Sequence, residues 1–234
     1  MSVISATGGI REEIAARLNE LETDNTDIYT NWINLGLRDI ALSFPNAPFL
    51  QTSADRTLSS GTRVYQSLVT NAERINTITV PSTQTKLQFF SPEEFDILNP
   101  SASQGGNPTI YTLRGYLPTG RFEFYPVPGS ALDIHIDYEK TISSVSIAAD
   151  TPEIPVKYYE LLVLYGEKLG LRRQKRYDIS KEVDQEYQVL KQKMMEDLIR
   201  QTSQMPRIKG VREFQLGNNI TTDPISQQFF GTGF

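Results

Sequence analysis

The sequence contains no cysteine, which excludes disulfides, thiolate nucleophiles and cysteine-ligated zinc. It contains a single histidine, His135, so one chain cannot supply a metal site built from several histidines. No apolar run approaches the ~20 residues that span a bilayer, and the first residues lack the basic and apolar segments of a secretion signal. We therefore expect a protein without cofactor, metal or membrane contact, synthesised in a cytoplasm.

An excess of positive charge is also missing. The 234 residues include 23 Lys and Arg against 28 Asp and Glu, a net charge of −5 at pH 7. A domain whose main role is to bind duplex DNA is normally strongly basic, so this balance disfavours that role. The hydrophobic fraction of 38% is ordinary for a globular protein, and the length fits one large domain or one domain with an insertion or tail.

Apolar residues recur at helical spacing in four stretches, two near each end of the chain. The stretches are residues 10–21, 28–44, 154–169 and 179–198. The second carries two apolar stripes, one with Ile33 and Leu37 and one with Leu35 and Leu42, so we expect it to be the central helix. For the fourth, Asp178 or Ser180 is the expected N-cap.

Between residues 48 and 141 the apolar period changes to two, which predicts strands. The expected strands are residues 74–80, 85–90, 109–113, 121–125 and 132–138. One short helix is expected to interrupt them, because Ser91-Pro92-Glu93-Glu94 has the pattern of a capping box with proline at the first helical position.

This order of elements predicts an α+β fold. We expect a helical bundle of two N-terminal and two C-terminal helices, a central β-rich insertion and an extended C-terminal arm. The expected divisions are residues 1–47 and 150–203 for the bundle, 48–142 for the insertion and 204–234 for the arm.

The arm is rich in Gly, Pro and Asn and has no sustained period, yet it keeps large apolar residues. They are Ile208, Val211, Phe214, Leu216, Ile220, Ile225, Phe229, Phe230 and Phe234. A disordered tail normally lacks such residues because it has no core to bury them in. Aromatic residues spaced along an extended segment favour docking on a partner, whereas the alternative is that the arm wraps its own domain.

One basic cluster stands out, at the end of the third helix and in the link to the fourth. Its members are Lys168, Arg172, Arg173, Lys175 and Arg176. Cations are favourable at a helix C-terminus, so part of the cluster needs no other function. The alternatives are a protein partner or nucleic-acid phosphates.

Three further groups of residues are candidates for chemistry or binding. Asp133, His135 and Asp137 share one face of a predicted strand and fit either part of a metal site or a solvated face, which we favour. The carboxylates of Glu123, Asp133, Asp137 and Glu139 are the residues on which a cell-wall hydrolase would depend. A sugar-stacking face would use Tyr111, Tyr116, Phe122, Phe124 and Tyr125. No phosphate-binding loop, dinucleotide fingerprint or nucleophile elbow is present, so we expect no catalytic residues and no enzyme.

Three segments resemble the head-to-tail adaptor family of tailed bacteriophages, also called connectors or tail accessory factors. The first runs from Asn31-Trp32 to the sequence LRDIA at residues 37–41. The second is YTLRGYLPTGRFEFYPVPGSALDIHIDYEK at residues 111–140, and the third is DTPEIPVKYYELLVLYGEKLGLRR at residues 150–173. With the order of elements, the resemblance covers residues 10–200.

The resemblance implies a non-enzymatic structural protein of the virion neck. It implies a dodecameric ring under the portal protein, contacts with tail or neck proteins, and packaged DNA that passes through the lumen without specific binding. It implies localisation at the head-tail junction after synthesis in the host bacterial cytoplasm. The alternative function is a virion glycan-binding or tail-fibre-attachment module.

Overall fold

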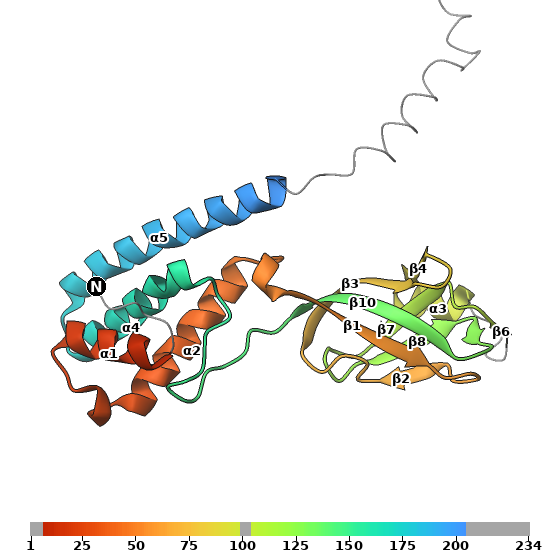
Figure 1. Ribbon diagram of the computed structural model, residues 1–234, viewed down its shortest axis with the longest axis horizontal. Coiled ribbons are helices and arrows are strands. Elements are labelled where there is room, and N and C mark those ends of the chain that lie inside the picture. The colour runs from red at the N-terminus through yellow and green to blue at the C-terminus, as the bar shows by residue number, and fades with distance from the viewer. Residues whose placement is uncertain (1–6, 99–103, 205–234) are drawn as a thin grey trace, which may run out of the picture. The chain divides into compact units, whose positions relative to one another are not determined.

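The computed structural model describes residues 7–98 and 104–204, which Figure 1 draws as coloured ribbons. Within these residues the fold is α+β, as the sequence predicts, and combines α-helices with several small β-sheets. The chain divides into two compact units, Met1–Gln192 and Lys193–Phe234, and residues 193–204 are the described part of the second. None of the described helices is long and apolar enough to cross a membrane.

Four long helices come from the two ends of the described chain, as predicted. They are α1 (Thr7–Leu18), α2 (Thr26–Ser43), α4 (Tyr159–Arg173) and α5 (Tyr177–Gln204). Single 3-10 turns at Glu22–Asp24, Pro48–Leu50 and Val156–Tyr158 lie before or after them. Both α1 and α2 pack against α4, so the two N-terminal helices meet a helix more than 100 residues away in sequence.

The most buried of these helices is α4, and the prediction that α2 is central is wrong. Residues 161–164 of α4 are four consecutive apolar residues and all are buried, so protein surrounds this helix. On α2 the stripe with Ile33 is buried, but in the other stripe Leu35 is 36% and Leu42 is 78% exposed. The apolar pattern of a helix does not say which of its stripes finds a neighbour within the same chain.

Two glycines allow α1 to lie close to α4. A Cβ atom added at Gly166 would lie 2.4 Å from Cδ1 of Ile14, and one added at Gly170 would lie 2.2 Å from Cδ1 of Leu18. Real carbon atoms in van der Waals contact are about 3.5–4.0 Å apart, so a larger residue at either position would push the helices apart. The close packing of α1 on α4 therefore depends on these two glycines.

The middle of the chain forms two sheets of four strands and one of two strands. The first, here the β10 sheet, has the order β1 (Gln51–Leu58), β10 (Leu132–Lys140), β3 (Ala72–Val80), β4 (Thr85–Lys86). The second, here the β8 sheet, has the order β2 (Val64–Gln66), β8 (Arg121–Tyr125), β7 (Ile110–Arg114), β5 (Gln88–Phe89). The strands β6 (Gly105–Gly106) and β9 (Val127–Pro128) pair with each other.

The prediction for residues 85–90 was wrong in one respect, and the strands β1, β2, β6 and β9 were not predicted. Residues 85–90 form the short strands β4 and β5, which belong to different sheets with buried Leu87 between them. β1 pairs with β10 along its whole length, from Gln51 opposite Glu139 to Leu58 opposite Leu132. Its sequence, QTSADRTL, has too few apolar residues for the period-two pattern to be visible.

The β10 and β8 sheets pack face to face, and their core lies between them. Ile134 and Ile136 of β10 and Phe122 and Phe124 of β8 belong to this core and are fully buried. Burying side chains of this size contributes roughly 1.5–3 kcal/mol each to stability. Because side chains alternate along a strand, the residues between them point away from the core. The polar residues of β10 and β8 therefore lie on opposite outer faces of the two packed sheets.

Candidate interaction surfaces

The basic cluster lies on the last turns of α4 and in the turn that leads to α5. Arg172, Arg173, Lys175 and Arg176 are exposed, but Lys168 is 8% exposed. Arg173 donates to Oδ1 of Asn25 at 3.2 Å. The four exposed cations lie where the α4 dipole favours positive charge.

Lys168 joins α4 to α5 from inside the protein. Its Nζ atom lies 3.0 Å from Oδ1 of Asp184 and over the rings of Tyr165 and Tyr187, 4.3 and 4.9 Å from their centroids. A buried ammonium is stable only with such compensation, here one carboxylate and two aromatic faces. Lys168 is therefore committed to the fold, whereas a partner contact of the exposed members stays a prediction.

A second polar contact links α2 to α5. Asp39 of α2 accepts hydrogen bonds from the Tyr187 hydroxyl at 2.5 Å and from Nζ of Lys191 at 2.6 Å. Partial burial acts to raise the pKa of Asp39, but these two hydrogen bonds outweigh it and the pKa is lowered. Burial, followed by the hydrogen bond to Asp39, raises the pKa of Tyr187. The carboxylate thus stays charged and holds the two helices together.

The turn between α4 and α5 corrects the predicted N-cap of α5. The helix begins at Tyr177, before Asp178 and Ser180, so neither residue caps it. Ser180 is buried, and its hydroxyl donates to the carbonyl of Lys168 at 3.1 Å. The end of α4 is closed by Lys175, which has a left-handed φ of +62°. The backbone N–H of Arg176 then donates to the carbonyl of Leu171 in the last turns of α4.

The arm predicted at residues 204–234 lies outside the described residues except for Gln204, the last residue of α5. This applies to all nine of its apolar residues, from Ile208 to Phe234. Its docking on a partner therefore stays a prediction from the sequence.

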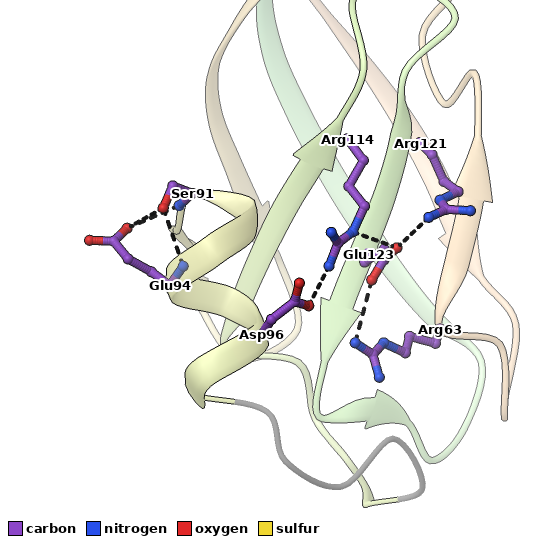
Figure 2. A network of polar contacts seen from close by, with 7 residues as sticks. All are labelled: Arg63, Ser91, Glu94, Asp96, Arg114, Arg121 and Glu123. Carbon is purple, nitrogen blue, oxygen red and sulfur yellow. Dashed lines mark hydrogen bonds and ion pairs between the residues drawn. The ribbon is translucent and has the colours of Figure 1, made fainter.

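An ionic network that the sequence did not reveal lies on the outer face of the β8 sheet. Figure 2 shows Glu123 among three arginines, whose nearest nitrogens are 3.0 Å (Arg114), 3.1 Å (Arg121) and 3.4 Å (Arg63) from its carboxylate oxygens. Arg114 also contacts Asp96 of α3 (Pro92–Leu98). The Glu123 side chain is only 7% exposed, and the three guanidinium groups compensate for the loss of its contact with water.

The short helix α3 covers part of the same face, and its capping box is confirmed. The backbone N–H of Ser91 donates to Oε2 of Glu94 at 3.1 Å, and the N–H of Glu94 donates back to the Ser91 hydroxyl at 3.3 Å. Phe95 is fully buried, and the Arg63 guanidinium lies 5.4 Å from the centre of its ring. The cap thus positions both Phe95 and Asp96 beside the arginines.

The outer face of the β10 sheet is acidic and solvated. His135 lies between two aspartates, with Nδ1 2.6 Å from Asp55 and Nε2 3.3 Å from Asp137. The hydrogen bond with Asp55 is the main cause that raises the pKa of His135, and the charge of Asp137 adds to it. Asp133 instead accepts a hydrogen bond from Thr57 at 2.6 Å, so Asp133, His135 and Asp137 do not converge on one point.

The aromatic residues proposed for sugar stacking do not share a surface. Phe122, Phe124 and Tyr111 are buried in the core between the sheets, whereas Tyr116 is 91% exposed. Tyr125 points outward and its hydroxyl bonds Gln104. A glycan could therefore not stack on these residues as a set.

The carboxylates proposed for hydrolysis are separated in the same way. Glu123 lies on the outer face of the β8 sheet, whereas Asp133 and Asp137 lie on the outer face of the β10 sheet. Glu139 is 6% exposed, pairs with Arg74 at 3.0 Å and accepts the backbone N–H of Asn46 at 3.1 Å. Glycoside hydrolysis needs two carboxyls that face each other about 5–9 Å apart across a cleft, and Glu123 faces away from the other three.

The model of a protein family described as SU10 adaptor protein matches residues 6–211, a span that includes every described helix and strand. No curated protein matches the chain.

Proposed function

Because the chain belongs to the SU10 adaptor protein family, a family of phage head-to-tail adaptors, we propose that it forms a ring under the portal of a tailed phage. In this position it connects the portal to the tail and lets DNA pass. The observation that carries the proposal is the family match, which spans the helices and the β-sheets alike. The role is structural, and the protein belongs to the virion, at the head-tail junction.

The proposed partners are the portal protein, tail or neck proteins, and further copies of the chain in a dodecameric ring. The helices at residues 1–47 and 150–203 would form the bundle of each copy, and residues 48–142 the β-rich insertion. Packaged DNA would pass through the lumen without specific binding, which the net charge of −5 supports because like charges keep phosphates from adhering. Synthesis in the host bacterial cytoplasm precedes assembly.

The proposal assigns the contact with the portal to residues 204–234. Their nine large apolar residues, Phe229, Phe230 and Phe234 among them, would fill pockets on the partner. The exposed cations at the end of α4, including Arg172 and Arg176, are a second proposed contact, with an acidic partner surface.

Native mass spectrometry of the full chain, alone and mixed with the portal ring of the same phage, tests the proposal. We expect monomer alone and a dodecamer on the portal, because the partner organises the ring. Failure to form any complex with the portal would contradict the adaptor function. Deleting residues 205–234 removes the proposed arm and should abolish portal binding. It leaves every described element in place, so the circular dichroism of the helices should not change. Unchanged portal binding would contradict the role of the arm.

A further inference from the structure

Each of the two packed sheets carries a cluster of charged side chains on its outer face. On the β8 sheet, Arg63, Arg114 and Arg121 form a cluster that we call the arginine patch. On the β10 sheet, Asp55, Asp133 and Asp137 form a cluster that we call the acidic face. Since the core lies between the sheets, the patch and the acidic face point in opposite directions.

The arginine patch holds three guanidinium groups close together. All three contact Glu123, and Arg114 also contacts Asp96. The Arg121 side chain is 49% exposed, and the contact that the structure gives it is made by Nη2 alone. A guanidinium has five N–H donors in a planar fork that matches a carboxylate, so Arg121 can accept a further carboxylate from outside.

The acidic face carries three exposed or half-exposed carboxylates, and one lysine shares it. By register, Asp55, His135, Thr79 and Lys86 lie in one row across the sheet. Asp55 is 82% and Asp137 47% exposed. The side chains that bond the three carboxylates are Thr57, Thr77 and His135, which compensate at most one charge. Hydroxyl groups leave a carboxylate its full charge, so this face attracts cations.

We propose that the arginine patch of one copy binds the acidic face of the next copy, so that the β-sheets form the head-to-tail contact around the ring. The inference rests on the ring proposed above. A ring requires two different, complementary patches on each subunit, and opposite faces of two packed sheets provide them. Each copy then uses its patch on one neighbour and its acidic face on the other.

Charge also favours a second copy over DNA as the occupant of the patch. An arginine patch that includes the carboxylates of Glu123 and Asp96, on a chain of net charge −5, is far from the basic surface that phosphate binding requires. A carboxylate partner needs only the matching fork of Arg121. The contact is therefore expected to direct copies into register and to weaken as salt is added.

Charge reversal and rescue test the contact in the full chain mixed with the portal ring. Arg121→Glu and Asp55→Arg each bring like charges together, so each should reduce the amount of complete ring on the portal by roughly tenfold or more in native mass spectra. The double variant Arg121→Glu/Asp55→Arg restores opposite charges between neighbours and should recover most of it. Lys181→Glu, the same charge change at an exposed α5 residue, is the matched control and should assemble like the wild type.

Two further variants keep the test independent of folding. Arg121→Gln removes the charge without adding a carboxylate beside Glu123. It should reduce the amount of complete ring, but less than Arg121→Glu does.

The chain has no cysteine, so the pair Arg121→Cys and Asp55→Cys can be introduced into an otherwise cysteine-free protein. A disulfide needs Cα atoms within about 7 Å, and the two packed sheets are already about 10 Å apart, so this pair can link only different copies.

Oxidation of assembled rings of the double-cysteine variant should give a ladder of covalent oligomers, whereas Arg121→Cys with Lys181→Cys should not. If wild-type rings form but the reversals assemble like Lys181→Glu and no ladder appears, this contact is wrong while the adaptor function stands. If the wild type forms no complex with the portal, both the contact between copies and the adaptor function are contradicted. Salt-sensitive binding of duplex DNA that Arg121→Glu removes, measured by fluorescence anisotropy, would assign the patch to phosphate and overturn the contact.

Discussion

The helical part and the β-sheets of this protein use charged residues in opposite ways. Between α4 and α5, Lys168 is buried against Asp184 and two tyrosine rings, and its charge joins two elements of one chain. In the sheets, the space between the elements is filled by apolar and aromatic residues such as Ile136 and Phe124, and the charges lie on the outer faces.

This difference separates scaffold from surface. A charge inside the helical part is compensated by neighbouring residues of the same chain, so removing it lowers the stability of the fold. A charge on the outer face of a sheet stays partly exposed, as Arg121 and Asp55 do, so it can also act on a partner. Substitutions in the helices are therefore expected to affect folding first, and reversals on the sheet faces to affect assembly first.

The largest effect is expected where α1 lies closest to α4. Gly170→Val would place atoms where Leu18 now lies, since even a Cβ would be 2.2 Å from Cδ1 of Leu18. We expect a loss of about 3 kcal/mol in the free energy of unfolding, measured in urea, because an overpacked core must shift. Valine has a higher helix propensity than glycine, so propensity alone would stabilise the variant and a loss reports the clash. In a Leu18→Ala background, Gly170→Val should therefore cost much less than in the wild type. An equal loss in both backgrounds would show that the clash with Leu18 is not its cause.

Removal of the buried charge should have a smaller effect. Lys168→Met keeps the length of the side chain but leaves Asp184 without its cation. The Asp184 side chain is 36% exposed and can turn to water, so we expect a loss of about 2 kcal/mol, below the cost of a fully buried broken pair. Hydrogen exchange should speed up in residues 177–192 of α5. Adding Asp184→Asn should restore part of the loss, and no restoration would show that the tyrosine rings, not the carboxylate, hold Lys168.

In the β region, a helix cap offers a test with a local effect. Ser91→Ala removes both side-chain hydrogen bonds that Ser91 makes with Glu94. We expect a loss of about 1 kcal/mol, the usual cost of an N-cap, with α3 exchanging its amide hydrogens faster while α4 is unchanged. Ser91→Thr keeps the hydroxyl and should retain most of the stability, and Ser130→Ala at an exposed turn should change nothing. An equal loss in the threonine variant would mean that the cap does not stabilise α3.

The sequence predicted the elements whose signal is local. The Ser91-Pro92-Glu93-Glu94 box and the strand at residues 121–125 both appear where they were expected, because capping and period-two alternation act within a few residues. The stripe with Leu42 was expected to be buried but is exposed, because its burial depends on residues distant in sequence. The strand β1 was missed, because it pairs with β10, which is also distant in sequence.

The interaction surfaces show the same limit. The sequence showed that Lys168 belongs to a basic cluster but not that Asp184, about two turns into α5, would pair with it inside the protein. Arg63, Arg114 and Arg121 are spread over 59 positions and gave no signal, since only the pairing of β2, β8 and β7 brings them to Glu123. Asp55 was hidden in the unpredicted strand β1, although Asp133, His135 and Asp137 were correctly placed on one face.

The smallest effect is expected from the titration of His135, the only histidine and therefore a single resolved probe. Its pKa is raised above the ordinary value of 6.5, mainly by the hydrogen bond with Asp55. A group with a raised pKa stabilises the fold fully below its unfolded pKa, and the contribution is lost as the pH rises through the folded value. Stability should therefore fall slightly as the pH rises above 6.5.

Two variants test the contact with Asp55. In Asp55→Asn, the pKa of His135 measured by NMR should move back toward 6.5, and the pH dependence of stability should shrink. Asp133→Asn should change the pKa of His135 less, because Asp133 bonds Thr57. An unchanged titration in Asp55→Asn would show that Asp137 alone sets the pKa, and would remove Asp55 from the contacts of His135.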